Sequence, residues 1–364
     1  MFVEQRTLTA DEQRDPGEPA LVPGALRLRV DEIIWETEDA RSISLLAEGA
    51  EPVGYRSGQF ITFRVPVGGT PVARSYSLSS APGTEPGRLV VTVKRQRGGL
   101  ASTWLCEQLR VGDRLLALPP AGNFFPRDLN RDVLLIARSS GITPMLSILK
   151  TLLGEGTGRC ELFYANRDNE STIFRRQLTE LEQQYPGRVR ATFWDESASG
   201  RTEAELLSEH LAAFRGWEAF VCGSTAFETT ALDALQRLGF PHGDVHVEDF
   251  VSLTGDPFLA VEAPTKTTDA DTDTVSLAVE LNGETHELRW PRAQRLLDTL
   301  LAAGIAAPFS CREGACSACA CVLNEGEMSM DNNEVLDETD LAEGLRLSCQ
   351  SRPMSDDIRV SYDG

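Results

Sequence analysis

Four cysteines near the C-terminus constrain this 364-residue chain more than any other feature. Cys311, Cys316 and Cys319 follow the pattern C-x4-C-x2-C, and Cys349 stands downstream of them. This is the ligand spacing of a two-iron, two-sulfur cluster, with three thiolates on one loop. A structural zinc site usually has two short-spaced pairs, and this sequence supplies only one cysteine on the C-terminal side. The four cysteines are therefore predicted to bind a [2Fe–2S] cluster, and Cys321, outside the spacing, to be a buried core residue.

Residues 274–364, which contain these cysteines, are predicted to form a small unit. Their Asn282-Gly283 pair joins two alternating strands, a strong hairpin signal. The whole segment resembles the plant-type ferredoxin family, which implies an α+β β-grasp domain. It carries sixteen acidic residues against seven arginines, a balance that favours docking on a basic surface. The Thr-, Asp- and Pro-rich stretch 255–273 before it is predicted to be a linker.

The rest of the chain shows two different patterns. Residues 1–23 are polar and without period, so they are predicted to be a flexible tail. Residues 24–128 contain short β-rich runs separated by turns, typical of an antiparallel β-barrel. Residues 129–254 alternate strands with helices, which predicts an α/β domain with a mainly parallel sheet. Such a sheet binds ligands at the carboxyl ends of its strands, here after Ala137 and Cys222.

Two motifs in the β-rich segment indicate a bound flavin. The first is Arg74-Ser75-Tyr76-Ser77, which offers a cation, an aromatic ring and hydroxyls on one strand. The second is a basic residue followed by glycines at a helix start near Ser102, where backbone amides can bind an anion. Its members are Lys94, Gly98, Gly99, Leu100 and Ser102. In this order, ahead of an α/β segment, the two motifs resemble the ferredoxin–NADP reductase superfamily.

That resemblance implies particular roles for these residues. Arg74 is expected to contact the flavin phosphate, Tyr76 to pack on the isoalloxazine ring, and Ser77 to reach its N5 edge. The segment from Gly98 to Ser102 is expected to hold the pyrophosphate. In the stretch Glu248-Asp249-Phe250, the phenylalanine is expected to cover the opposite face of the flavin. The candidate catalytic residues are Ser77, Cys222 and Glu248.

The choice of flavin rests on the second motif. Relatives with this domain order, resembling phthalate dioxygenase reductase, use FMN. The Lys94-Arg95 pair followed by Gly98-Gly99 is more similar to the branch that uses FAD. FAD is therefore preferred to FMN.

A nicotinamide site is expected in the α/β segment. Gly141, Thr143 and Pro144 join a strand to a helix, and Cys222-Gly223 ends a later strand. The resemblance implies that Thr143 lines the pocket and that Cys222 approaches the ring carbon that gives up hydride. Arg167, with Arg175 and Arg176, offers to pair with a 2′-phosphate. Asp168 or Glu170 offers instead to bind a free ribose hydroxyl, so NADH and NADPH both remain open.

Charge and hydropathy limit the partners and the location. The net charge of −20 predicts repulsion from nucleic acid and from anionic membrane surfaces. The first residues lack a basic flank followed by an apolar core, so no signal peptide is expected. No run approaches the ~18 apolar residues of a membrane helix. The expected protein is cytoplasmic, not integral to a membrane, and does not bind nucleic acid.

The three parts in this order resemble the reductases of multicomponent oxygenases. Those serving 3-ketosteroid 9α-hydroxylase and phenylacetyl-CoA epoxidase are most similar, and acyl-desaturase reductases are also similar. The resemblance implies that NAD(P)H reduces the flavin, which passes single electrons to the cluster. From there they would reach a partner desaturase or terminal oxygenase, either Rieske-type or hydroxylating a steroid or aromatic ring. Two alternatives remain: a redox-sensing regulator, and a stand-alone NAD(P)H oxidase or quinone reductase.

Overall fold

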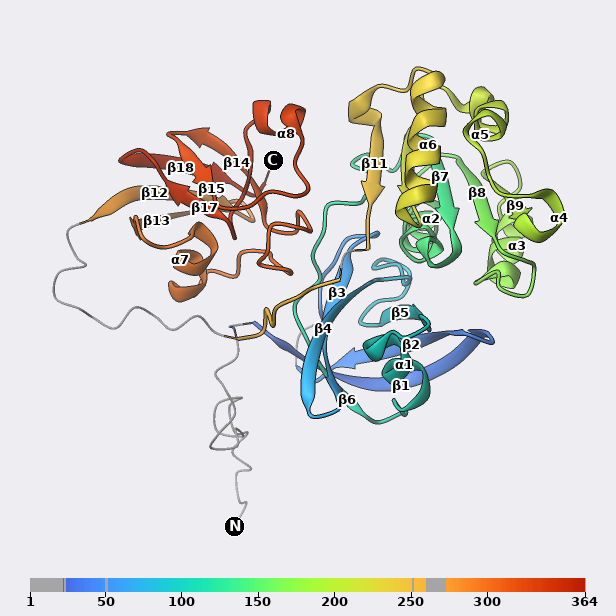
Figure 1. The fold of residues 1–364 in the computed structure, drawn as a ribbon, viewed down its shortest axis with the longest axis horizontal. Helices are drawn as coiled ribbons and strands as arrows, with labels where there is room; N and C mark the ends of the chain where they lie inside the picture. Colours follow the sequence, from blue (N-terminus) through green and yellow to red (C-terminus); the bar gives the residue numbers. More distant parts are fainter. Residues whose placement is uncertain (1–21, 23, 50–51, 251, 260–272, 364) are drawn as a thin grey trace, which may run out of the picture.

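Three β-sheet units succeed one another along the chain (Figure 1). The computed structural model describes residues 22, 24–49, 52–250, 252–259 and 273–363. The predicted tail 1–23, except Val22, and residues 260–272 of the predicted linker lie outside the described residues. The predicted boundaries at 128/129 and 273/274 fall between the sheets.

The first unit is a six-stranded antiparallel barrel. Its strand order is β4-β3-β6-β1-β2-β5, and a bridge between Leu78 and Val91 joins the two ends of the sheet. Leu28, Ile43 and Phe63 are fully buried in its core, as expected where strands alternate inward and outward side chains. The elements are β1 (Leu26–Thr37), β2 (Ala40–Ala47), β3 (Phe60–Val67), β4 (Thr70–Ser77), β5 (Leu89–Lys94), α1 (Leu100–Glu107) and β6 (Arg114–Ala117).

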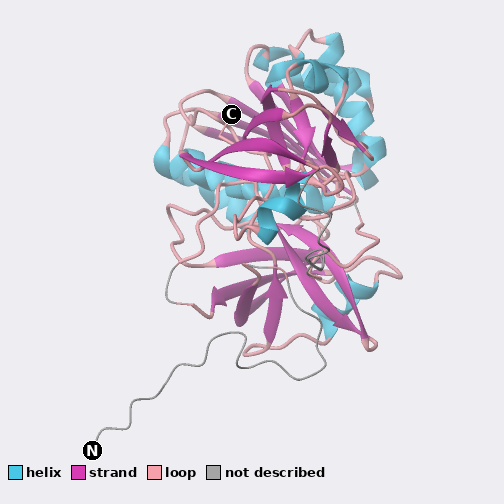
Figure 2. Ribbon diagram, turned by 90° about the vertical axis from the view of Figure 1, so that its left-hand side faces the viewer, coloured by secondary structure: helices cyan, strands magenta, loops and turns pink. Residues whose placement is uncertain are grey.

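The second unit is a five-stranded parallel sheet with helices on both faces (Figures 1 and 2). The strand order is β11-β10-β7-β8-β9, so the chain adds β8 and β9 on one side of β7 and β10 and β11 on the other. Ligands are expected where the order switches sides, beside the carboxyl ends of β7 and β10. The elements are β7 (Val133–Arg138), η1 (Ser139–Gly141), α2 (Ile142–Glu155), β8 (Cys160–Asn166), α3 (Arg175–Gln184), β9 (Val189–Asp195), α4 (Glu196–Ser199), α5 (Ala204–Leu211), η2 (Ala212–Phe214), β10 (Glu218–Cys222), α6 (Thr225–Arg237), η3 (His242–Asp244) and β11 (Val245–Glu248).

The third unit is a mixed sheet with the order β13-β12-β18-β14-β16, in which β12 and β18 are parallel. The predicted hairpin is confirmed, since Asn282 and Gly283 turn the chain with φ of 56° and 76°. Helix α7 and Trp290 are packed in its core. The elements are β12 (Thr274–Leu281), β13 (Glu284–Pro291), α7 (Leu296–Ala302), β14 (Ala320–Glu325), β15 (Met328–Met330), α8 (Glu338–Ala342), β16 (Leu345–Leu347), β17 (Ser351–Pro353) and β18 (Asp357–Ser361).

Side chains from the barrel and the third unit meet directly. The hydroxyls of Thr62 and Ser310 are 2.8 Å apart, and Phe60 of β3 packs with Ala318. Val22 and Phe258, which belong to the predicted tail and linker, are buried in the same core as the third unit, and the Val22 amide donates to the Phe258 carbonyl at 2.9 Å. Both side chains are apolar, so their burial stabilises the fold although the residues around them in the sequence are mostly polar. Among the helices that the structure describes, none is long and apolar enough to cross a membrane.

Candidate functional site

The four predicted cluster ligands come together on one loop and one strand end. The Cys311 amide donates to Cys316 Sγ at 3.4 Å, and the Glu313 and Ala315 amides donate to Cys311 Sγ at 3.3 and 3.4 Å. Hydrogen bonding with Cys349 lowers the pKa of the Cys319 thiol. Four neighbouring thiols, two of which accept backbone amides, are a donor set of the kind that a two-iron cluster requires, so these residues fit the group.

Backbone geometry explains how the loop wraps around this position. Arg312, Gly314 and Ser317 have φ of 60°, 86° and 49°, in the left-handed region. At Gly314 a Cβ would lie 2.9 Å from the Asn332 carbonyl oxygen, so only glycine fits without a shift. Cys321 is 2% exposed and its thiol contacts the Arg346 carbonyl, which confirms it as a core residue.

A cavity of about 660 Å³ lies where the three units meet. Ser75 and Ser77 line it from the barrel. Glu248 and Phe250 line it from the parallel sheet, and Cys316 lines it from the cysteine loop. One cavity therefore contacts the predicted flavin edge, the predicted ring cover and one predicted cluster ligand.

The three candidate catalytic residues lie next to one another. Ser77 Oγ donates to Glu248 Oε2 at 3.1 Å, and Glu248 pairs with Cys222 in the parallel register of β10 and β11. Burial raises the pKa of Glu248 to about 8, so this carboxyl keeps its proton at neutral pH. Burial also raises the pKa of Cys222 well above its usual value, so this side chain is a neutral thiol.

Arg74 and Tyr76 lie on the other side of β4 from the two serines. The Arg74 guanidinium donates to the Leu253 carbonyl at 3.0 Å, and the Tyr76 ring packs 6.0 Å from that of Phe63. Neither residue is among those lining the cavity, and their roles toward phosphate and ring remain predictions.

The glycine motif forms an open turn ahead of α1. Gly98 has a φ of 76° and open space around its α-carbon, and Gly99 is the N-cap. The helix begins at Leu100 rather than near Ser102, because the Ser102 hydroxyl closes the turn by accepting from the Gln96 amide at 3.1 Å. Lys94 lies apart from this turn and donates to Ser139 Oγ at 3.0 Å. The Gly99 amide donates to the Gln96 carbonyl at 3.0 Å, so a phosphate would meet the amides of Gly98 and of the first residues of α1.

At the carboxyl ends of β7 and β10, the nicotinamide motifs are in contact. A Cβ on Gly141 would lie 2.1 Å from the Cys222 carbonyl oxygen, so glycine lets the start of α2 pack on the end of β10. The Thr143 hydroxyl donates to the Ser140 carbonyl at 3.0 Å, and Pro144 lies in the first turn of α2. The Gly223 amide donates to Oε1 of the buried Glu228 side chain at 3.0 Å. The two motifs therefore form one surface at the predicted place.

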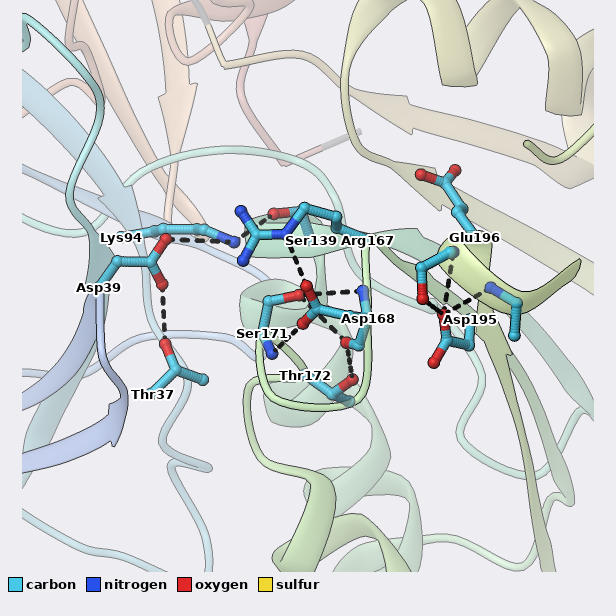
Figure 3. Close-up of polar contacts among 12 residues, drawn as sticks. Thr37, Asp39, Lys94, Ser139, Arg167, Asp168, Ser171, Thr172, Asp195 and Glu196 are labelled. Atoms are coloured by element: carbon cyan, nitrogen blue, oxygen red, sulfur yellow. Dashed lines mark hydrogen bonds and ion pairs between the residues drawn. The ribbon is translucent and has the colours of Figure 1, made fainter. Parts of the chain in front are cut away.

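A network of charged groups borders this surface (Figure 3). Lys94 of the barrel forms a 3.8 Å ion pair with Asp39 beside Ser139. Arg167 Nε donates to Asp168 Oδ2 at 2.7 Å. This hydrogen bond is the largest of the effects that lower the pKa of Asp168 to about 2. The side chains of Arg175 and Arg176 are directed elsewhere, over the Phe193 ring and toward Glu180.

Two further residues, Phe60 at the cavity and Glu313 on the cysteine loop, escaped the sequence analysis. Phe60 packs with Ala318 and Cys316, which brings an aromatic ring of the barrel against the cysteine loop. Glu313 accepts from the Thr254 hydroxyl at 2.7 Å and from the Gly255 amide, which ties the cysteine loop to the segment after β11. No local signal distinguishes either residue, because each contact joins segments that are distant in sequence.

Comparison with known proteins agrees with this arrangement. The oxidoreductase FAD-binding domain family matches residues 27–125, the oxidoreductase NAD-binding domain family matches 135–233, and the 2Fe-2S iron-sulfur cluster binding domain family matches 279–354. The solved structure of phthalate dioxygenase reductase, described as modular for electron transfer from pyridine nucleotides to [2Fe-2S], is similar with a TM-score of 0.58 and 25% identity. That match covers 93% of this chain and 98% of the other.

Two relatives match over nearly their whole length. The ferredoxin reductase component of 3-ketosteroid-9-alpha-monooxygenase from Mycolicibacterium smegmatis is 49% identical, with 93% of this chain and 97% of the relative covered. A component of the 1,2-phenylacetyl-CoA epoxidase from Escherichia coli is 32% identical, with 92% and 97% covered. The expected flavin, nicotinamide and iron–sulfur cofactors are confirmed. The chain therefore belongs to the family of oxygenase ferredoxin reductase components, oxidoreductases that pass electrons from NAD(P)H through FAD to a [2Fe–2S] cluster.

Proposed function

We propose that this reductase supplies a terminal oxygenase that acts on a 3-ketosteroid. The observation that carries the electron route is the cavity lined jointly by Ser77, Glu248 and Cys316. The choice of acceptor is supported by the 49% identity to a reductase component named for a 3-ketosteroid monooxygenase. An acyl desaturase is the alternative acceptor.

The residues around the cavity have two roles: some bind the cofactors, and others hold a proton near them. Bound FAD supplies the conversion between a two-electron hydride donor and a one-electron acceptor. Ser77 Oγ and the protonated Glu248 carboxyl hold a proton at the cavity wall, 3.1 Å apart. Phe250, 42% exposed beside them, is the residue that must move or share space when a nicotinamide enters.

The barrel motifs and the turn before α1 serve binding in this proposal. The Gly98 amide and the first amides of α1, which follows the N-cap Gly99, bind the pyrophosphate. Arg74 and Tyr76 contact the phosphate and the ring, and Ser75 supports the same site. Lys94, which donates to Ser139 Oγ, serves the nucleotide surface instead. Gly141, Thr143, Pro144, Arg167 and Gly223 hold the nicotinamide nucleotide at the strand ends.

Packing between units fixes the barrel against the cysteine loop. Phe60, Ala121 and Ala318 are buried together, with Cys316 against them. A packed contact of this kind holds the two redox sites at a constant separation. The Glu313 contacts with the segment after β11 support the same arrangement.

Steady-state electron transfer tests the proposal against its two rivals. The purified protein is mixed with NADH or NADPH, ferricyanide, and a 3-ketosteroid oxygenase. We expect reduction of ferricyanide and substrate turnover that requires the oxygenase. Negligible reduction of any acceptor would favour the redox-sensing regulator. Flux to oxygen or a quinone that survives deletion of residues 274–364 would favour the stand-alone oxidase or quinone reductase.

The proposed location is the cytoplasm. NAD(P)H is the donor of this family, and this soluble nucleotide supports the proposal. Cell fractionation with detection of the flavoprotein tests this location.

A further inference from the structure

Two buried hydroxyls lie behind the cysteine loop without a hydrogen-bond partner among the described residues. Ser348 is 0% exposed and its Oγ has no partner, and the same holds for the buried Oη of Tyr362. Both backbone groups of Ser348 are satisfied, by the Cys319 carbonyl at 3.1 Å and the Leu297 amide at 3.0 Å. Burying an unpaired hydroxyl costs free energy, so a partner is expected for each.

The strand register shows where these hydroxyls point. Strands β14 and β16 pair Ala320 with Leu347 and Cys321 with Arg346. The bond from the Ser348 amide to the Cys319 carbonyl extends the pairing by one step, so Ser348 stands opposite Cys319. Residues directly opposite in an antiparallel pair direct their side chains to the same face, with Cβ atoms ~5 Å apart. The Ser348 and Cys319 side chains therefore lie on the same face of this pair.

Tyr362 joins this face from the other side. Strand β18 pairs Ser361 with Val322 of β14, so Tyr362 comes next to Cys321. Cys319 directly precedes β14, and its carbonyl continues the pairing with Ser348, so its side chain lies on the same face as that of Cys321 two residues later. The hydroxyls of Ser348 and Tyr362 therefore lie on the side of β14 that carries the Cys319 ligand.

We propose that Ser348 donates a hydrogen bond to the Cys319 thiolate of the loaded cluster, that Tyr362 supports it, and that the pair sets the reduction potential. This rests on the assignment of the four cysteines as ligands. Reduction adds an electron to an already negative centre, so a donor to a ligating sulfur stabilises the reduced form more than the oxidised form. Ser348 is a positioning residue that acts through Cys319.

Redox titration of the loaded holoprotein, followed by electron paramagnetic resonance, tests the proposal. We expect Ser348→Ala to make the reduction potential of the cluster more negative by about 59 mV. For a one-electron couple this is about a tenfold change in the equilibrium constant of electron transfer. Tyr362→Phe should shift it in the same direction by less, and Ser348→Thr should keep the native value. Ser351→Ala is the matched control, because Ser351 is also buried but donates to the Leu347 carbonyl at 2.8 Å.

A second readout is the exchangeable proton near the reduced centre. In the resonance spectrum of the reduced cluster, exchange into deuterium oxide should remove a proton hyperfine coupling that belongs to the Ser348 hydroxyl. Ser348→Ala should lack this coupling, and Ser348→Thr should retain it. Iron and sulfide contents separate the two levels of the inference: a wild type without them refutes the ligand assignment, whereas a loaded Ser348→Ala with native potential overturns the role of Ser348. If Ser348→Ala does not load, Tyr362→Phe decides, and a native potential there overturns the proposal.

Discussion

Ser77 Oγ of the barrel donates to Glu248 Oε2 of the parallel sheet at 3.1 Å, across 171 positions of sequence. This bond joins two units at the cavity that also contains the cysteine loop. It places a hydroxyl and a protonated carboxyl side by side where hydride is expected to arrive. The first two predictions follow from this pair.

Replacing Ser77 by alanine removes the donor that both flavin and Glu248 would use. We expect hydride transfer from the nicotinamide to slow by about tenfold or more, which corresponds to ~1.4 kcal/mol of activation free energy. Stopped-flow absorbance of flavin reduction measures it. Ser79→Ala is the control, because its buried hydroxyl bonds Thr92 within the barrel. Equal slowing in both variants would show that the loss is structural.

Glu248 makes stability depend on pH in a predictable direction. Its pKa rises from 4.5 to about 8 in the folded protein because of burial, so between these values the folded state holds a proton that the unfolded state has lost. The contribution is complete below pH 4.5 and is lost as the pH rises toward 8. Thermal unfolding of flavin-free protein should show a falling Tm over this range, and a smaller fall in Glu248→Gln. Glu334→Gln, at the same cavity, should behave like the wild type, and identical slopes in all three proteins would contradict the assignment.

Loss of one cluster ligand should separate the two halves of the electron route. We expect Cys316→Ser to abolish electron delivery to a protein acceptor and the resonance signal of the reduced cluster, while ferricyanide reduction by the flavin persists. Cys106→Ala, a buried barrel cysteine, should retain both activities. Survival of protein-acceptor reduction in Cys316→Ser would refute the route.

We expect the carboxylates at the nucleotide surface to favour NADH over NADPH. Arg138 is held by Glu196 at 2.7 Å and Arg167 by Asp168, so a 2′-phosphate would meet negative charge beside arginines that are already paired. We expect kcat/KM for NADH to exceed that for NADPH by at least about tenfold. Asp168→Asn should lower the ratio of kcat/KM for NADH to kcat/KM for NADPH, and Glu180→Gln on α3 should leave this ratio unchanged. A ratio near one in the wild type would contradict this interpretation of the charges.

Local pattern determined much of this protein. The spacing of Cys311, Cys316 and Cys319 specifies a ligand loop because three thiolates must converge within a few residues. Alternating strands and helices specified the parallel sheet, and its order explains why the ends of β7 and β10 meet. The Arg74–Ser77 and Gly98–Ser102 motifs indicated a flavin because their chemistry is carried by neighbouring residues.

Only the tertiary structure decided which distant residues share a site. The contact of Ser77 with Glu248, the packing of Phe60 on Cys316, and the position of Ser348 opposite Cys319 all depend on how sheets close and dock. Sequence patterns repeat over a few residues and report one strand or turn at a time, whereas register and docking are set by burial summed over whole surfaces. The kinds of cofactor could therefore be predicted from short motifs, and the residues that adjust them could not.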